Sequence, residues 1–331
     1  AALAASIAGT GWLLRHPAIG RLADQPNARS AHRVPTPRGG GLAIVATTSI
    51  CVAALYLSGR IPASITACLD IGALAVAAVG FRDDIKSTPV AVRMAVHFGA
   101  ALLAVALLGG GVTELPVGSL LLHLGAAGSV ICTLAIVWTL NLFNFMDGID
   151  GIAASEATFV LFASAAISVL ASNASWEQAA PSLVVGSACL GFLVWNWSPA
   201  SIFMGDVGSG YLGYILAVIG VDSVRDHVLN VYVWLILGGV FFVDATLTLI
   251  RRLARRERVH QAHRSHAYQR LARRWGSHAR TTAAVIAIDV LWLLPCATLA
   301  EKYPPYSAWI CALALIPLAA AAFACGAGKA E

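Results

Sequence analysis

The chain has 331 residues, of which 58% are hydrophobic and only 12% are charged, and its formal net charge is +5. A soluble globular chain carries roughly twice that share of charged residues. Composition therefore excludes a soluble domain, a disordered chain and a disulfide-rich secreted scaffold. It predicts an all-α, polytopic integral membrane protein whose charges lie in the gaps between apolar segments.

Apolar runs separated by polar breaks predict about 11 transmembrane helices. The first run is short for a span, but no charged n-region and cleavage site accompany it, so it is interpreted as a trimmed span and not as a signal peptide. In chain order the expected spans are 1–14, 40–58, 63–81, 90–108, 123–140, 152–171, 180–197, 208–221, 228–250, 281–299 and 307–325.

The basic residues divide unequally between the two sides that alternating spans create. Nineteen of the 22 Lys and Arg residues fall in, or within a few residues of, one set of gaps, and only Arg60, Arg225 and Lys302 belong to the other. The positive-inside rule then makes the first side cytoplasmic, with the N-terminus outside and the C-terminus inside. The cytoplasmic loops are expected near 15–39, 82–89, 141–151, 198–207 and 251–280.

Five aspartates from three distant gaps fall on this same side, although the charge sorting did not use them. Carboxylates that gather at one face of a membrane bundle, beside an arginine-rich loop, indicate a metal and phosphate site. Ordinary polar loops are the alternative. The five are Asp83, Asp84, Asp147, Asp150 and Asp206.

The first acidic motif is the adjacent pair Asp83 and Asp84, with Lys86 close by. Adjacent residues cannot share a helix face, so the two acids are expected to do different work. One carboxylate could hold Mg²⁺ and the other could take a proton from an attacking group, while Lys86 balances charge. A solvated loop would also carry such a pair.

The segment 141–151 is more specific, because its polar residues recur at every third position. This step keeps Asn141, Asn144, Asp147 and Asp150 on one side of a helical or nearly helical segment. A helix terminus capped by Asp150 is the alternative. Farther along, Asp206 follows Gly205 at the expected start of a span, where a carboxylate suits a metal ion shared with a diphosphate. Arg38, before Gly39–Gly41, could clamp a phosphate.

The loop 251–280 contains a run of arginines and then the cluster His263, Arg264 and His266. Anchoring to anionic lipid would explain the first five arginines but not the histidines. Zinc binding is the alternative for the histidines, although no further Cys or His stands at ligand spacing. Three aspartates remain inside expected spans, of which Asp244 would border the cytoplasmic site; the other two are Asp70 and Asp289.

Taken in order, these motifs strongly resemble the polyprenyl-phosphate N-acetylhexosamine-1-phosphate transferases, which form glycosyltransferase family 4. The resemblance spans almost the whole chain, and the residues that carry it are Arg29–His32, Pro35–Gly41, Asp83–Asp84, Asn144–Gly151, Phe203–Ser209 and His263–His266. It implies Mg²⁺-dependent transfer, with Mn²⁺ as an alternative metal, of a sugar-1-phosphate from a UDP-sugar to undecaprenyl phosphate, with release of UMP.

Carried over to this chain, the resemblance implies that Asp83 is the base for the lipid phosphate, with Asp84 beside it, and that Asp206 is the principal Mg²⁺ ligand. Asn144, Asp147 and Asp150 look like nucleotide-site or catalytic residues, and His263 and His266, with Arg264, look like a diphosphate-binding motif. Ser265 interrupts that motif where the family usually has a third histidine. This departure resembles the branch that begins O-antigen or exopolysaccharide chains, with GlcNAc or FucNAc as the sugar.

The resulting hypothesis is a single transmembrane catalytic domain, 1–331, in the bacterial inner membrane, with its active site on the cytoplasmic face. Its partners would be the two substrates and the bilayer, with no nucleic acid, and a homodimer is left open. Phospho-MurNAc-pentapeptide transferase remains the alternative within the family. A proton-coupled transporter would need acids near the midplane and repeated halves, and a CDP-alcohol phosphotransferase would need further carboxylates downstream.

Overall fold

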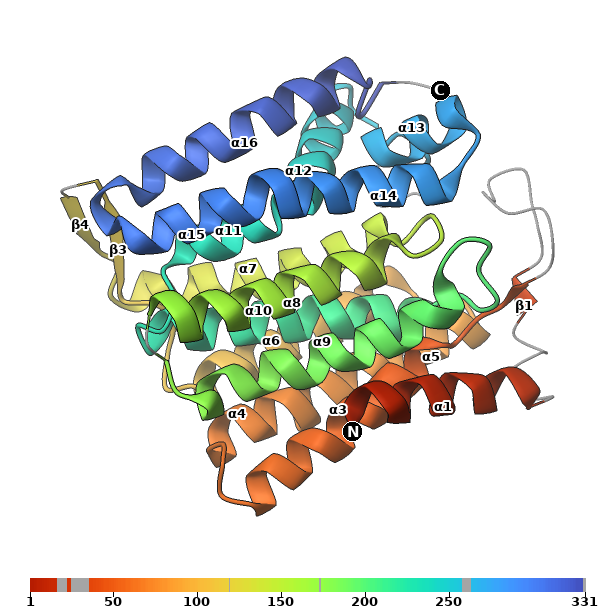
Figure 1. The fold of residues 1–331 in the computed structure, drawn as a ribbon, viewed down its shortest axis with the longest axis horizontal. Coiled ribbons are helices and arrows are strands. Elements are labelled where there is room, and N and C mark those ends of the chain that lie inside the picture. The colour runs from red at the N-terminus through yellow and green to blue at the C-terminus, as the bar shows by residue number, and fades with distance from the viewer. Residues whose placement is uncertain (17–22, 25–35, 119, 173, 258–262, 330–331) are drawn as a thin grey trace.

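The computed structural model describes residues 1–16, 23–24, 36–118, 120–172, 174–257 and 263–329. The motif residues Arg29–His32 lie outside these ranges. The described chain is mostly helical, and its long helices run side by side across the view in Figure 1. Two short antiparallel strand pairs accompany them: β1 (Ala23–Asp24) with β2 (Thr36–Pro37), and β3 (Glu114–Val117) with β4 (Leu120–His123).

The helices form one bundle, with the β3–β4 hairpin at one end and α13 at the other (Figure 1). In chain order they are α1 (Ala2–Arg15), α3 (Gly41–Leu57), α4 (Ala63–Ala67), η1 (Cys68–Gly72), α5 (Ala73–Ile85), α6 (Val90–Leu107), α7 (Ala126–Met146), α8 (Ile152–Ala171), α9 (Trp176–Asn196), α10 (Asp206–Arg225), α11 (Val231–Leu237), α12 (Gly239–Ala254), α13 (Ala267–Trp275), α14 (His278–Ile288), η2 (Asp289–Leu293), α15 (Leu294–Lys302), η3 (Pro304–Tyr306) and α16 (Ser307–Ala324).

Among the described residues, eight helices are long and apolar enough to cross a membrane, and the bent pair α11 and α12 would add a ninth. Helix α3, with 17 residues, and helix α1, with 14, are shorter. The chain is therefore a polytopic, all-α protein as composition predicts. The count of eleven spans and the outside placement of the N-terminus stay predictions.

Several features differ from those expected. The segment 228–250 is broken by a 77° bend between α11 and α12, where Gly238 and Gly239 are adjacent and disfavour a continuous helix. Helices α5 and α7 run past 81 and 140, so Asp83, Asp84 and Asn144 stand on final helical turns and not in loops. The gap after 108 contains the β3–β4 hairpin, which apolar runs alone did not indicate.

Helix α10 lies at the centre of the bundle and packs against α5, α7 and α3. Its Tyr211 and Tyr214 are among the largest fully buried side chains in the described part of the chain. The backbones of α10 and α3 approach so closely that a Cβ on Gly41 would lie 2.4 Å from the Cα of Gly208. This contact places the first turn of α10 beside the ends of α3 and α5, where the conspicuous polar residues gather.

Candidate active site

The junction of α5 and α10 is held by the carboxylate of Asp84. Its two oxygens accept hydrogen bonds from the backbone N–H groups of Asp206, at 2.9 Å, and Val207, at 3.0 Å. The residue before the helix, Gly205, has φ +77°, and a Cβ there would lie only 2.7 Å from Asp84 Oδ2. Glycine is therefore needed at 205, and Asp84 caps the N-terminus of α10.

Arg93, in the first turns of α6, lies between two of the predicted acids. Its Nη1 is 2.6 Å from Asp83 Oδ2 and 3.6 Å from Asp206 Oδ2. Asp83 also accepts a hydrogen bond from the backbone N–H of Thr88. The side chain of Asp83 is only 12% exposed, whereas that of Asp206 is 35% exposed. Asp206 is thus the more accessible of the two carboxylates.

The end of α7 adds an amide and a third carboxylate. The side chain of Asn144 donates a hydrogen bond to Ser209 Oγ on α10 at 3.0 Å. Asp147 follows directly after α7, and burial together with the charge of Asp206 raises its pKa to about 7. The Arg38 guanidinium acts on Asp147 in the opposite direction, and its charge also reaches Asp84. The structure therefore brings together predicted residues from four segments.

Asp150 has a different set of neighbours. Its carboxylate lies 3.2 Å from His278 Nδ1 and accepts a hydrogen bond from the backbone N–H of Ala200 at 3.3 Å. Burial opposes ionisation, but the hydrogen bond and charge of His278 hold the pKa of Asp150 below its usual value. Thr282 donates to the Asp150 carbonyl at 2.9 Å. These contacts tie the loop after α7 to α14, so this carboxylate is engaged within the protein.

The histidine loop is fixed by Asp244 of α12. This carboxylate accepts hydrogen bonds from the backbone N–H groups of Ala267, at 2.8 Å, and Tyr268, at 3.0 Å, and so caps α13. Asp244 Oδ1 is also 3.4 Å from His266 Nδ1. His263 stacks on His266 with ring centroids 4.9 Å apart. Burial and the neighbouring His266 lower the pKa of His263 to about 4, so His263 is neutral near pH 7.

Helix α13 joins this loop to the acidic cluster, because the Tyr268 hydroxyl donates to the Phe145 carbonyl at 3.1 Å.

Arg264, between the histidines, accepts a hydrogen bond through its carbonyl from Arg273 at 2.8 Å. Lys86 is exposed at the C-terminal end of α5. The Gly41 N–H, which could have faced a phosphate, instead donates to the Met204 carbonyl at 2.9 Å.

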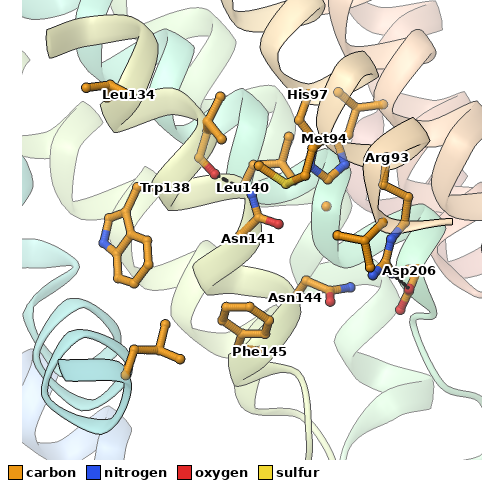
Figure 2. Close-up of a pocket in the computed structure, with 15 residues that line it drawn as sticks. Arg93, Met94, His97, Leu134, Trp138, Leu140, Asn141, Asn144, Phe145 and Asp206 are labelled. Carbon is orange, nitrogen blue, oxygen red and sulfur yellow. Dashed lines mark hydrogen bonds and ion pairs between the residues drawn. The ribbon is translucent and has the colours of Figure 1, made fainter. Parts of the chain in front are cut away.

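A cavity of about 510 Å³ opens beside the cluster, between α5, α6, α7, α10 and α12. Figure 2 shows Arg93, Asn144 and Asp206 on one side of it, and Leu134 and Trp138 on the other. His97 lies one helical turn beyond Arg93. Most of the remaining lining is apolar, so Arg93, Asn144 and Asp206 of the cluster border a largely apolar chamber.

Sequence reasoning overlooked Arg93 as a site residue and treated it only as one of the charges that set orientation. Its position inside an expected span was the available signal, because charged residues within membrane segments commonly have a specific partner. No site role was predicted for Tyr268 either. Nothing in its local sequence indicates that its hydroxyl contacts a carbonyl 123 residues earlier in the chain.

Residues 66–224 match the family described as glycosyl transferase family 4. The chain is 30% identical over 275 residues to a probable undecaprenyl-phosphate N-acetylglucosaminyl 1-phosphate transferase of Bacillus subtilis, covering 81% of this chain and 75% of the relative. It is 31% identical over 299 residues to a decaprenyl-phosphate N-acetylglucosaminephosphotransferase of Mycobacterium tuberculosis, covering 81% and 72%. A phospho-N-acetylmuramoyl-pentapeptide-transferase of Heliobacterium modesticaldum is 32% identical over 232 residues, covering 66% and 68%.

Proposed function

Because the chain belongs to glycosyl transferase family 4, we propose that it transfers an N-acetylhexosamine-1-phosphate from a UDP-sugar to undecaprenyl phosphate and releases UMP. Membership confirms the resemblance that the motifs indicated. The observation that carries the proposal is the position of Arg93, Asn144 and Asp206 in the lining of the largely apolar cavity. Such a place can hold a phosphate and the first part of a polyprenyl chain together.

In the proposed reaction an oxygen of the lipid phosphate attacks the β-phosphorus of the UDP-sugar. The bond from that phosphorus to the bridging oxygen breaks, and UMP leaves. Protein groups in such a reaction chiefly position two anions and reduce their repulsion. We assign Arg93 to the lipid phosphate, since it is the one Arg or Lys among the described residues that line the cavity. Asp83, held by Arg93 at 2.6 Å, is assigned as the base for any proton remaining on that phosphate.

The donor set suits a magnesium ion. No group of three or more His, Cys, Asp or Glu able to enclose a metal occurs within the described ranges. Mg²⁺ commonly keeps several waters and takes only one or two protein carboxylates together with substrate phosphates. Asp206 is assigned as the principal ligand, with Asp147 beside it and Mn²⁺ as an alternative metal. The bound ion would neutralise negative charge on the diphosphate.

The proposed donor is UDP-GlcNAc or its 6-deoxy analogue UDP-FucNAc, for the first membrane step of O-antigen or exopolysaccharide synthesis. The two N-acetylglucosamine-transferring relatives support this choice, as does Ser265 within the histidine motif. The excess of basic residues on one side supports a cytoplasmic active site in the bacterial inner membrane. His263 and His266 are assigned to the donor diphosphate.

The test is a transfer assay with ³²P in the β-phosphate of the UDP-sugar, using purified protein and undecaprenyl phosphate. We expect the label in the lipid fraction and unlabelled UMP in solution. Label recovered in UDP, with none in lipid, would show sugar transfer without the phosphate and would overturn the proposal. A panel containing UDP-GlcNAc, UDP-FucNAc and UDP-MurNAc-pentapeptide separates the proposed donors from the peptidoglycan substrate.

A further inference from the structure

The turn that follows α16, residues 325–329, lies against the histidine loop. The Gly328 N–H donates a hydrogen bond to the Ser265 carbonyl at 2.7 Å. Ser265 stands between His263 and His266 and is only 2% exposed. Its hydroxyl lies 3.0 Å from His263 Nδ1. The turn therefore contacts the residue that links the two histidines.

Three arginines fasten this turn to α12 and α13. Arg251 donates to the Ala327 carbonyl at 2.7 Å, Arg255 donates to the Gly328 carbonyl, and Arg270 donates to the Lys329 carbonyl at 2.7 Å. The Arg251 guanidinium also lies over the Phe323 ring, 4.3 Å from its centroid. Cations at the C-terminal end of a helix are favourable because they complement the helix dipole. These arginines thus have partners within the protein, beyond any role in lipid anchoring.

Gly328 sits where a side chain would not fit. Its φ is +67°, and a Cβ would lie 2.8 Å from the Thr248 carbonyl oxygen. Thr248 in turn donates to Asp244, the residue that caps α13 and faces His266. A substitution at Gly328 would therefore push the turn away from α12 and disturb its bond to Ser265.

We propose that the turn 325–329 is a positioning element of the nucleotide-sugar site, which holds the His263–His266 loop in place for the donor diphosphate. The inference rests on the proposed function, in which those histidines bind the donor. It adds the end of α16 to a site otherwise built from α5, α6, α7, α10 and α13. The turn itself touches neither substrate.

The test compares Gly328→Ala with Gly59→Ala. Gly59 has a similar φ of +70°, but a Cβ added to it would meet no other atom within 4 Å, so it controls for backbone strain. For Gly328→Ala we expect the KM for the UDP-sugar to rise about fivefold, the size of one lost hydrogen bond. The kcat and the KM for undecaprenyl phosphate should change by less than about twofold. Arg270→Gln should give a smaller change in the same direction.

Hydrogen–deuterium exchange supplies a readout that does not need activity. The backbone amides of 263–269 should exchange faster in Gly328→Ala than in the wild type and in Gly59→Ala. Unchanged exchange there would overturn the proposal, and so would faster exchange with an unchanged KM for the donor. Absence of transfer by the wild-type protein would instead overturn the proposed function, while the exchange result would still decide whether the turn holds the loop.

Discussion

Asp84 accepts a hydrogen bond at 2.9 Å from the backbone N–H of Asp206, a residue 122 positions later in the chain. The acid at the end of α5 thereby satisfies a donor at the start of α10 and interacts favourably with the positive end of that helix. Within the acidic pair, Asp84 thus helps to position the start of α10, which carries Asp206. Asp83, its neighbour, faces Arg93 instead.

The cap predicts a structural effect of Asp84→Asn. One oxygen of the carboxamide could still accept, but its NH₂ group would face the second backbone donor. We expect a loss of about 1–3 kcal/mol in stability, the cost of an unsatisfied buried group, with a corresponding fall in apparent melting temperature. Transfer should fall as well, because α10 carries Asp206. A variant as stable as the wild type would contradict the capping role.

Arg93→Gln tests the cation beside the cavity. Removing the guanidinium leaves Asp83 and Asp206 without the charge between them and removes the proposed partner of the lipid phosphate. We expect the KM for undecaprenyl phosphate to rise roughly tenfold or more, as for a lost charge-assisted hydrogen bond. Arg225→Gln, at the other end of α10, is the control and should leave that KM unchanged. Equal values for the two variants would exclude Arg93 from acceptor binding.

Asp206→Asn tests the proposed metal ligand. The cap on α10 uses the backbone of Asp206 and not its side chain, so folding should be preserved. We expect turnover to fall by at least ~10²-fold with loss of the response to added Mg²⁺. Asp222→Asn is the matched control, because it lies on the same helix about 24 Å away by helical rise. Near-normal turnover in purified Asp206→Asn would refute the assignment.

Asp147 predicts a pH dependence of stability. Folding raises its pKa from 3.8 to about 7, so the folded protein binds this proton more tightly than the unfolded chain. The resulting stability is fully present below about pH 4 and is lost as the pH rises through 7. In a chelating buffer, the apparent melting temperature should fall between pH 5.5 and 8.5, and less so in Asp147→Asn. Identical curves for the two proteins would contradict the shift.

Glu156 on α8 and Asp289 in η2 are two neighbouring buried acids, each with 0% exposure. Glu156→Gln keeps the volume and can donate to Asp289, so its melting temperature should stay close to that of the wild type. Glu156→Ala leaves a cavity and an unpaired acid, and should lose more than about 2 kcal/mol. Thermal melts of both variants test this expectation. Equal losses of stability in the two variants would show that Glu156 and Asp289 do not interact.

The gathering of Asp83, Asp84, Asp147 and Asp206 could be predicted because alternation of spans fixes which gaps share a side. That argument needs only hydropathy and charge. It cannot distinguish a carboxylate that faces substrate from one that caps a helix. Asp84 and Asp83 are adjacent in sequence, and their difference arises from partners on two other helices.

Hydropathy and charge could not predict the bend at Gly238 or the hydrogen bonds that hold the turn 325–329. Hydropathy runs smoothly through 228–250, and only packing shows that the chain turns by 77° there. The arginines of α12 resemble an ordinary membrane-boundary run in the sequence. Their hydrogen bonds to carbonyls after α16 depend on a contact more than 70 residues away.

The size of the cavity has a consequence for how the acceptor would be chosen. A chamber of about 510 Å³ can enclose only the beginning of a long isoprenoid, and the remainder must stay among the acyl chains of the bilayer. The protein would then select the acceptor by its phosphate and the adjoining isoprene units, and it would make no contact with the far end of the lipid. Short-tailed, detergent-dispersible polyprenyl phosphates should consequently serve as acceptors. The bilayer would affect the local concentration of an acceptor, and not how well it fits the cavity.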